Sequence, residues 1–268
     1  MKLIASRDNP TFKDLRDLAG DARRQRREGR TLLDGPHLVT AALDHDIVPE
    51  LLVVSESANA LPEVSAILSR AASVPQLCLR DVLYREISEL ETPLGILALI
   101  RPPATAGIPD SGDCLLLDAV QDAGNVGTLL RTAAAAGVRN ILLGPGCAGA
   151  WTPRVLRAAQ GAHFALAISE QVDLAAFLTR YRGQSIAAVA HQGKPVFDLA
   201  FDTATAWLFG SEGAGVSPAL AAAVQQRATI PLAEGSESLN VGAAAAVCLF
   251  EMRRQRTIKK STPAGRQP

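Results

Sequence analysis

Aromatic side chains are scarce in this sequence, at 4% of 268 residues, and methionine occurs only twice. Apolar residues nevertheless make up 48% of the chain, so its core must consist mostly of aliphatic side chains. Together with 20% charged residues, this composition excludes a disordered chain. A chain of this length buries about three quarters of its unfolded surface, so it needs no disulfides to fold.

Cysteine is also rare, and the four residues lack the spacing of a metal or redox site. No two of them form a CxxC pair, and no histidine lies near them in a ligand pattern. Cys78, Cys114 and Cys248 lie in apolar runs and are typical of small buried residues in a reducing compartment. The sequence therefore predicts no metal site.

Long hydrophobic segments are absent as well. No stretch reaches 18 uninterrupted apolar residues, and the first residues lack the apolar core of a signal peptide. These absences argue against a membrane span and against secretion, so we expect a cytoplasmic protein.

Charge of one sign does not dominate the whole chain, since 27 basic residues balance 27 acidic ones. Residues 1–30, however, carry nine basic and five acidic side chains, and residues 251–268 carry six against one. The two ends are thus basic and the middle is acidic. Such ends either meet a polyanion or form solvated helix faces.

A linker separates two regions of different pattern. Residues 101–112 contain three prolines and two glycines and show no hydrophobic period. We expect an N-terminal domain over 1–104, a linker over 105–112, a larger domain over 113–258 and a flexible basic tail over 259–268.

Both regions show an α/β pattern. The first 45 residues have a helical pattern, and they are followed by a helix over 63–70 and strands over 51–54, 76–79 and 95–100. After the linker, apolar strands alternate with helices, which predicts a parallel sheet with ligand chemistry at the carboxyl ends of its strands. The expected strands are 114–117, 140–143, 164–168, 186–190, 206–209 and 228–231, and the expected helices are 126–136, 153–159, 174–181, 218–226 and 241–254.

The first polar segment at a strand end runs from Asp118 to Ala133. Asn125 precedes a helical pattern, so it is either a functional residue or a helix N-cap. Arg131 lies among apolar neighbours, where an arginine either extends to solvent or serves an anion or a site.

Two further strand ends carry glycine or polar residues. Residues 210–215 have the pattern GxxGxG, which matches neither a dinucleotide fingerprint nor a P-loop, and they contain a carboxylate, Glu212. After Ile230 and Pro231, a polar loop leads to an alanine-rich helix expected to begin near Ser238. Ser238 is therefore either a helix cap or a functional residue.

Three motifs follow one another in these segments. The first is Asn-x-Gly followed by Arg-Thr-Ala over 125–133, the second is a strand that runs into Gly-Ser-Glu-Gly-x-Gly over 210–215, and the third is Ile-Pro followed by Ser-Leu-Asn-Val at 238–241. In order and spacing they resemble the SpoU (TrmH-type) family of RNA ribose 2′-O-methyltransferases, in the SPOUT superfamily. The resemblance covers residues 113–256.

The resemblance implies a catalytic α/β domain with a deep trefoil knot, a fold that spacing alone would not suggest because knots are rare. It implies S-adenosylmethionine as cofactor, held near Gly210, Ile230 and Leu239. Arg131 would assist the ribose hydroxyl, either as a base or by stabilising charge, and Asn125 would orient Arg131 or the RNA. Glu212 and Asn240 would hold the arginine or the ribose, while Ser238 would cap its helix or contact the substrate.

The N-terminal region resembles the L30e-like RNA-binding extension of family members that modify rRNA. A basic helix there would contact RNA phosphates through the residues Arg23, Arg24, Arg26 and Arg27. The implied partners are RNA, with 23S rRNA favoured over tRNA, and a second copy of the chain in a homodimer, with no DNA and no membrane. The alternatives are the same chemistry on tRNA or an RNA-binding assembly factor without catalysis.

Overall fold

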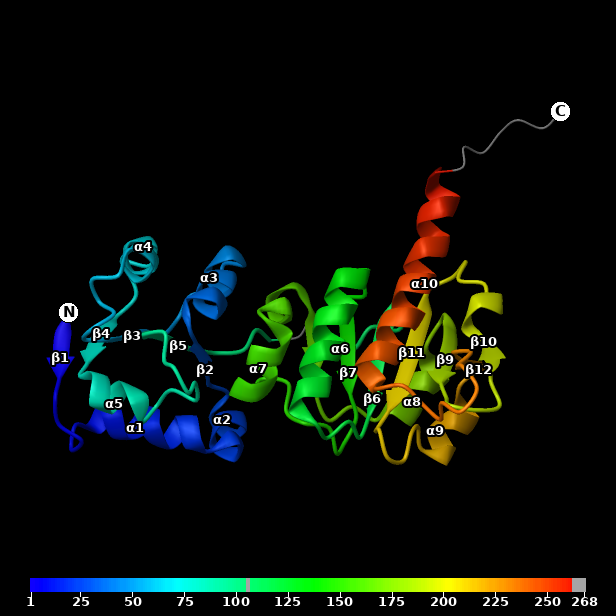
Figure 1. Ribbon diagram of the computed structural model, residues 1–268, viewed down its shortest axis with the longest axis horizontal. Helices are drawn as coiled ribbons and strands as arrows, with labels where there is room; N and C mark the ends of the chain where they lie inside the picture. Colours follow the sequence, from blue (N-terminus) through cyan, green and yellow to red (C-terminus); the bar gives the residue numbers. More distant parts are fainter. Residues whose placement is uncertain (105–106, 262–268) are drawn as a thin grey trace. The chain divides into compact units, whose positions relative to one another are not determined.

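The structure is a computed structural model that describes residues 1–104 and 107–261. The chain forms two compact units. The first comprises Met1–Ala104 together with Gly149–Phe164, and the second contains the remaining described residues. Both are built around a sheet flanked by helices (Figure 1), which confirms the expected α/β class.

The sheet of the first unit is mixed. Its order is β1 (Lys2–Ile4), β4 (Gln76–Leu79), β3 (Leu51–Ser55), β5 (Ile96–Ile100) and β2 (Thr31–Asp34). The strands β1, β4 and β3 are parallel, whereas β5 runs antiparallel to both β3 and β2. Two clusters of buried side chains lie in this unit, and the helices are α1 (Pro10–Gly20), α2 (Ala22–Glu28), α3 (Pro36–Asp44), α4 (Pro62–Arg70), α5 (Asp81–Arg85) and α7 (Pro153–Ala159).

The expectation that the first 45 residues are helical was wrong for two segments. Lys2–Ile4 pairs with β4, and Thr31–Asp34 pairs with β5. These strands have only three and four residues, so their sequences are too short to show a period of two. Their strand conformation depends on partners more than 60 residues away along the chain.

Residues 149–164 pack with the first unit although the segments on both sides of them belong to the second. The Thr31 hydroxyl donates to the Trp151 carbonyl oxygen at 2.7 Å, and Leu156 of α7 is buried in the same cluster as Leu33 and Val54. Apolar contacts and a hydrogen bond thus attach α7 to β2.

The second unit contains a seven-stranded sheet in which every pair is parallel. This confirms the interpretation of the apolar runs as buried parallel strands for β6, β7, β9 and β11, whereas the strand expected over 228–231 is β12, which ends at Thr229 and is mostly exposed. The order is β10 (Lys194–Pro195), β12 (Gln226–Thr229), β9 (Gln184–Ala188), β11 (Thr205–Gly210), β6 (Cys114–Asp118), β7 (Asn140–Leu143) and β8 (Ala167–Ser169). The helices are α6 (Ala123–Ala136), α8 (Leu174–Arg180), α9 (Pro218–Ala223) and α10 (Val241–Ser261).

Several expected boundaries differ from the observed ones. The strand expected over 164–168 is a 3₁₀ turn, Ala162–Ala165, followed by β8, because the buried ring of His163 packs against Trp151 with 4.9 Å between ring centroids. Helix α10 continues past the expected end at 254, and Arg256 in its added turns pairs with Asp113. The expected flexible tail therefore begins within this helix, and its residues 262–268 lie outside the described residues, as do 105–106 of the linker.

None of the helices in the described ranges is both long enough and apolar enough to span a membrane. The cysteines expected to be buried, Cys78, Cys114 and Cys248, are buried, and Cys147 is partly exposed. Burial raises the pKa of the Cys114 and Cys248 thiols to about 12. These thiols therefore remain protonated near neutral pH.

Candidate active site

The three polar segments meet at one edge of the parallel sheet. The ends of β6 and β11 lie side by side, because Gly210 pairs with Asp118, and β12 points the same way two strands further along. Parallel strands place their carboxyl ends on a common edge, so the loops that follow these strands converge there.

Side chains from all three segments form one hydrogen-bonded cluster. The side-chain amide nitrogen of Asn240 donates to Asn125 Oδ1 at 2.9 Å and to Glu212 Oε1 at 2.6 Å. These residues are separated by as many as 115 positions in the sequence. The structure therefore joins three of the predicted site residues through a single nitrogen atom.

The N-cap of α10 is Asn240, not Ser238. Asn240 Oδ1 accepts from the amides of Gly242 at 2.9 Å and Ala243 at 3.3 Å, and the helix begins at Val241. The start at Val241 confirms the first residue of the helix expected over 241–254. The cap alternative for Ser238 was wrong, because Asn240 is the residue that reaches the free amides of the first turn.

The N-cap of α6 is likewise not Asn125. Helix α6 begins at Ala123, and Asp122 Oδ1 accepts from the Asn125 amide at 2.7 Å. Asn125 thus lies in the first turn, where its side chain is free to bind Asn240. The interpretation of Asn125 as a helix cap was wrong because Asp122 provides the cap one turn earlier.

The loop that carries Glu212 folds tightly onto itself. Ser211 and Gly215 form an isolated antiparallel bridge, and the Ser217 amide donates to Asp118 Oδ2 at 2.7 Å. A Cβ atom on Gly210 would lie 2.0 Å from the Gly215 carbonyl oxygen, so only glycine fits there. Sequence reasoning missed Asp118, although its position at the end of a buried strand, beside the first motif, was a usable signal.

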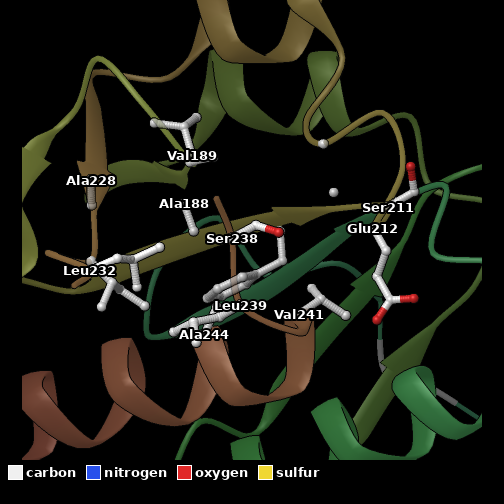
Figure 2. A pocket seen from close by; sticks show the side chains of 15 residues that line it. Ala188, Val189, Ser211, Glu212, Ala228, Leu232, Ser238, Leu239, Val241 and Ala244 are labelled. Carbon is white, nitrogen blue, oxygen red and sulfur yellow. The ribbon is translucent and has the colours of Figure 1, made fainter. Parts of the chain in front are cut away.

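A cleft of about 130 Å³ opens beside this cluster. The predicted cofactor residues Gly210, Ile230 and Leu239 all line it, as do Glu212 and Ser238. Figure 2 shows Glu212 at one end, Leu232 at the other, and Ser238 and Leu239 between them. The sequence motifs did not indicate several other lining residues, which carry no polar or glycine signal: Ala188, Val189, Ala190, Ala228, Leu232 and Ala244.

Arg131 does not join the cluster. It lies on the exposed side of α6, and its side chain makes no hydrogen bond or ion pair with any residue in the described part of the chain. Its expected orientation by Asn125, Glu212 or Asn240 stays a prediction, although the side-chain amide of Asn240 is already bonded to Asn125, to Glu212 and to the start of α10. The guanidinium group is available to a group from outside this chain.

The basic helix α2 contains cations of two kinds. Arg23 and Arg27 are exposed, whereas Arg24 is partly buried, donates to Glu28 Oε1 at 2.6 Å and pairs with Asp14. Hydrogen bonds from Arg24 and Arg30 lower the pKa of the Glu28 carboxyl to about 2. Arg24 is therefore engaged in holding the helix, and the exposed positions, Arg26 among them, face solvent.

Comparison with protein families decides the assignment. Residues 114–250 match the model of the SpoU rRNA Methylase family. The chain belongs to this family. Residues 9–98 also match the MRM3-like substrate binding domain, so the first unit has a counterpart of its own.

Related proteins match this SpoU methylase over nearly its whole length. It is 33% identical to the 23S rRNA (guanosine(2553)-2′-O)-methyltransferase RlmP of Bacillus subtilis, over 94% of this chain and 100% of that enzyme. The AviRb methyltransferase of Streptomyces viridochromogenes, solved with AdoMet, superposes with a TM-score of 0.83 at 25% identity, covering 93% of this chain and 98% of that one. An AdoMet-bound rRNA methyltransferase from Sinorhizobium meliloti gives a TM-score of 0.82 at 26% identity, with coverages of 94% and 97%.

The cleft of this methylase fits S-adenosylmethionine, the cofactor of the family. One wall is apolar, with Val189, Leu232, Leu239 and Val241, and suits the flat face of adenine. The amides of Ile230, Leu232 and Leu239 donate to no other residue that the structure describes, so they can bind the polar edge of the ring. Among those residues, no group of three or more metal-ligating side chains comes together.

Proposed function

We propose that this chain transfers the methyl group of S-adenosylmethionine to a ribose 2′-hydroxyl of 23S rRNA. The observation that carries the proposal is the cluster of Asn125, Glu212 and Asn240, which lies at the rim of a cleft suited to the cofactor. Relatives matched over nearly the whole chain are named as methyltransferases acting on this rRNA, at a guanosine in one case and at a uridine in another.

The work of the protein side chains is to position the hydroxyl and to stabilise charge. When bound, S-adenosylmethionine supplies a methyl group that is already electrophilic. Asn125 and Glu212 then orient the ribose beside the cleft, and alignment of this kind supplies much of the rate. Ser238, which lines the cleft, is placed to contact the substrate or cofactor.

Arg131 acts on the developing alkoxide or on the adjacent phosphate. A guanidinium keeps its proton in proteins and donates up to five hydrogen bonds, so charge stabilisation suits it better than proton removal. Its lack of a partner in the described chain supports an external ligand. The base role remains the alternative, to be separated by measurement.

The first unit serves RNA binding. Its match to a substrate binding domain supports this role. We also assign it the L30e-like fold, and its two buried apolar clusters beside a small sheet are consistent with that assignment. The exposed arginines of α2, Arg23, Arg26 and Arg27, contact phosphates, whereas Arg24 contributes through the helix that it holds. Single-stranded or looped RNA is the favoured target because it exposes a splayed nucleotide.

A homodimer completes the site. Phe250 and Ile258 of α10 are 46% and 52% exposed, and α10 packs against α6, which carries Arg131. Two copies that cover these apolar side chains would remove them from water, and we propose that Arg131 of one copy then serves the cleft of the other. The expected dimer is testable by light scattering, and a monomer at working concentration would contradict it.

The chain end after β12 threads a loop to form the trefoil knot. One close approach supports this, because a Cβ on Gly242 in α10 would lie 2.7 Å from the Thr128 methyl group in α6. We place the enzyme in the cytoplasm, where its free cysteines stay reduced.

The test is methyl transfer from radiolabelled S-adenosylmethionine to unmodified total RNA, separated into rRNA and tRNA. We expect label in 23S rRNA, lost by a factor of about 10² or more in Arg131→Ala. Because Arg131 has no partner in the described chain, this variant should fold and bind cofactor normally. The matched control is Arg139→Ala, an exposed arginine at the start of β7, on the opposite edge of the sheet.

Label in tRNA alone would contradict the rRNA assignment. Cofactor binding without label in any fraction would contradict catalysis and favour a non-catalytic RNA-binding factor. Full activity of Arg131→Ala would remove the role assigned to this residue.

A further inference from the structure

Every hydrogen-bonding position of the Asn240 side chain is occupied. A primary amide offers two N–H donors and an oxygen that accepts two bonds. In this chain the donors reach Asn125 and Glu212, and the oxygen accepts from two backbone amides of α10. Asn240 therefore has no atom left to bind a substrate.

The N-cap hydrogen bonds determine the orientation of the Asn240 side-chain amide. Backbone amides can only donate, so the atom facing Gly242 and Ala243 must be oxygen, and the nitrogen must face the cluster. The Asn125 atom that meets this nitrogen must then be an acceptor, Oδ1. The orientation of two amide side chains thus follows from the start of one helix.

The remaining atoms of the partners form a donor and acceptor pair. Asn125 Nδ2 and Glu212 Oε2 have no partner in the described residues, although the other terminal atom of each side chain is held by Asn240. One of the two donates and the other accepts. A hydroxyl group both donates and accepts, so an alcohol matches this pair.

We infer that Asn240 is a positioning residue, which presents Asn125 Nδ2 and Glu212 Oε2 as a fixed binding site for an alcohol. This inference rests on the proposed function in naming a ribose hydroxyl of the RNA as the ligand. Gly242 supports the geometry, because a Cβ atom there would lie 2.7 Å from Thr128 and would push α10 away from α6.

The decisive variant is Asn240→Asp, which keeps an acceptor for the helix cap but removes both donors. We expect the melting temperature and cofactor affinity to stay near those of the natural protein, since Asp caps helices as well as Asn. We expect kcat at pH 8 and saturating RNA to fall roughly 100-fold, because two carboxylates would repel where a bridge existed.

The split between kcat and KM separates this role from a merely structural one. Because the variant changes the group that holds Asn125 and Glu212 and not the apolar wall of the cleft, kcat should fall while the KM for S-adenosylmethionine stays within about two-fold of the natural value. Full activity at pH 8, or a loss explained entirely by weaker cofactor binding, would overturn the inference.

Two controls frame the measurement. Asn240→Ala should lose the cap and melt several degrees lower as well as losing activity. Asn9→Asp makes the same change at the N-cap of α1, where Oδ1 also accepts from two amides, Thr11 and Phe12. No side chain accepts from the Asn9 side-chain amide nitrogen within the described residues, so this variant should retain kcat.

The melting temperatures also test the inference. If Asn240→Asp melts at as low a temperature as Asn240→Ala, the inference is overturned.

A second readout needs no methyl transfer and so survives a failure of the proposed function. By nuclear magnetic resonance, both side-chain amide protons of Asn240 should exchange with water at least ten-fold more slowly than those of Asn125 and Asn9, because only Asn240 has both donors bonded. Equal exchange rates in the three residues would overturn the inference whatever the activity.

Discussion

Both units place polar side chains after neighbouring parallel strands, but those of the second unit lie beside a cleft. In the first unit, the Ser57 hydroxyl donates to Asp81 Oδ1 at 2.9 Å, in the segments that follow β3 and β4. In the second unit all strands run the same way, so the loops that follow β6, β11 and β12 meet at the cleft. In the first unit β5 runs antiparallel to its neighbours. Parallel strand direction therefore explains where the loops of the second unit converge.

Polar groups of the first unit have a different character. Asp34, at the end of β2, accepts from the Ser88 hydroxyl at 2.7 Å, and burial raises the pKa of its carboxyl. Its second oxygen, Oδ1, is buried without a partner in the described residues. Asp34 is thus a buried group that belongs to the interior of the first unit. The charged side chains of this unit that a ligand can reach include Arg23 and Arg27, on the exposed surface of α2.

The largest expected effect lies in the second unit. Gly210→Ala should abolish cofactor binding and lower the melting temperature strongly, because the added Cβ would meet the Gly215 backbone at 2.0 Å and backbone cannot move aside cheaply. Titration calorimetry with S-adenosylmethionine and thermal unfolding would measure both effects.

The control for this substitution lies three residues away. An added Cβ on Gly213 meets nothing within 4 Å, so Gly213→Ala should bind cofactor normally. If both variants bind equally well, the close packing of this loop is not what shapes the cleft.

A smaller effect is expected from the arginines of α2 in the first unit. Replacing Arg23 and Arg27 with alanine should weaken rRNA binding and lower the slope of log affinity against log salt by about 1 for each lost phosphate contact. Thermal stability should be unchanged, because both side chains are exposed.

Arg24→Ala should show the opposite behaviour. Its ion pair with Asp14 attaches α2 to α1, and its pair with Glu28 lies within α2, so the variant should melt earlier while the salt slope changes little. If the natural protein and the variant that lacks Arg23 and Arg27 show the same dependence of affinity on salt, then α2 does not contact RNA phosphates and its arginines are only solvated.

The smallest effect concerns His163, which is buried in the first unit. Its Nε2 lies 2.7 Å from the Ala150 carbonyl oxygen, and burial lowers its pKa to about 4. Between pH 6.5 and 4 the unfolded chain binds a proton that the folded chain does not, so stability must fall as the pH falls through this range.

His163→Gln should flatten the dependence of melting temperature on pH between 6.5 and 5.5, above the range where carboxyl groups titrate. His191→Gln, at an exposed histidine, should leave that dependence as it is. An unchanged profile in His163→Gln would show that this ring does not couple stability to pH.

Much of the second unit was predictable because each signal was local. Apolar runs such as Cys114–Leu117 and Ala206–Phe209 indicated buried parallel strands, and the motifs at their ends indicated the site. The helix caps were not predictable. Asn125, Ser238 and Asn240 are all suitable cap residues, and which of them reaches the free amides depends on the path of the loop.

The sequence also did not predict that residues 149–164 belong to the first unit. Helix α7 was expected from its pattern, but its packing against β2 depends on a hydrogen bond between residues 120 positions apart. The strands β1 and β2 were missed for the same reason, since their pairing partners are distant in the chain.

The sequence by itself determined the aliphatic core, the parallel strands of the second unit and the residue types of the site, because burial and strand period are written in neighbouring residues. Only the tertiary structure decided that Asn240 joins Asn125 to Glu212, that Arg24 is paired and that Arg131 has no partner among the residues that the structure describes. Hydrogen bonds and ion pairs act over about 3 Å, so residues far apart in the chain meet only after the fold has brought them together.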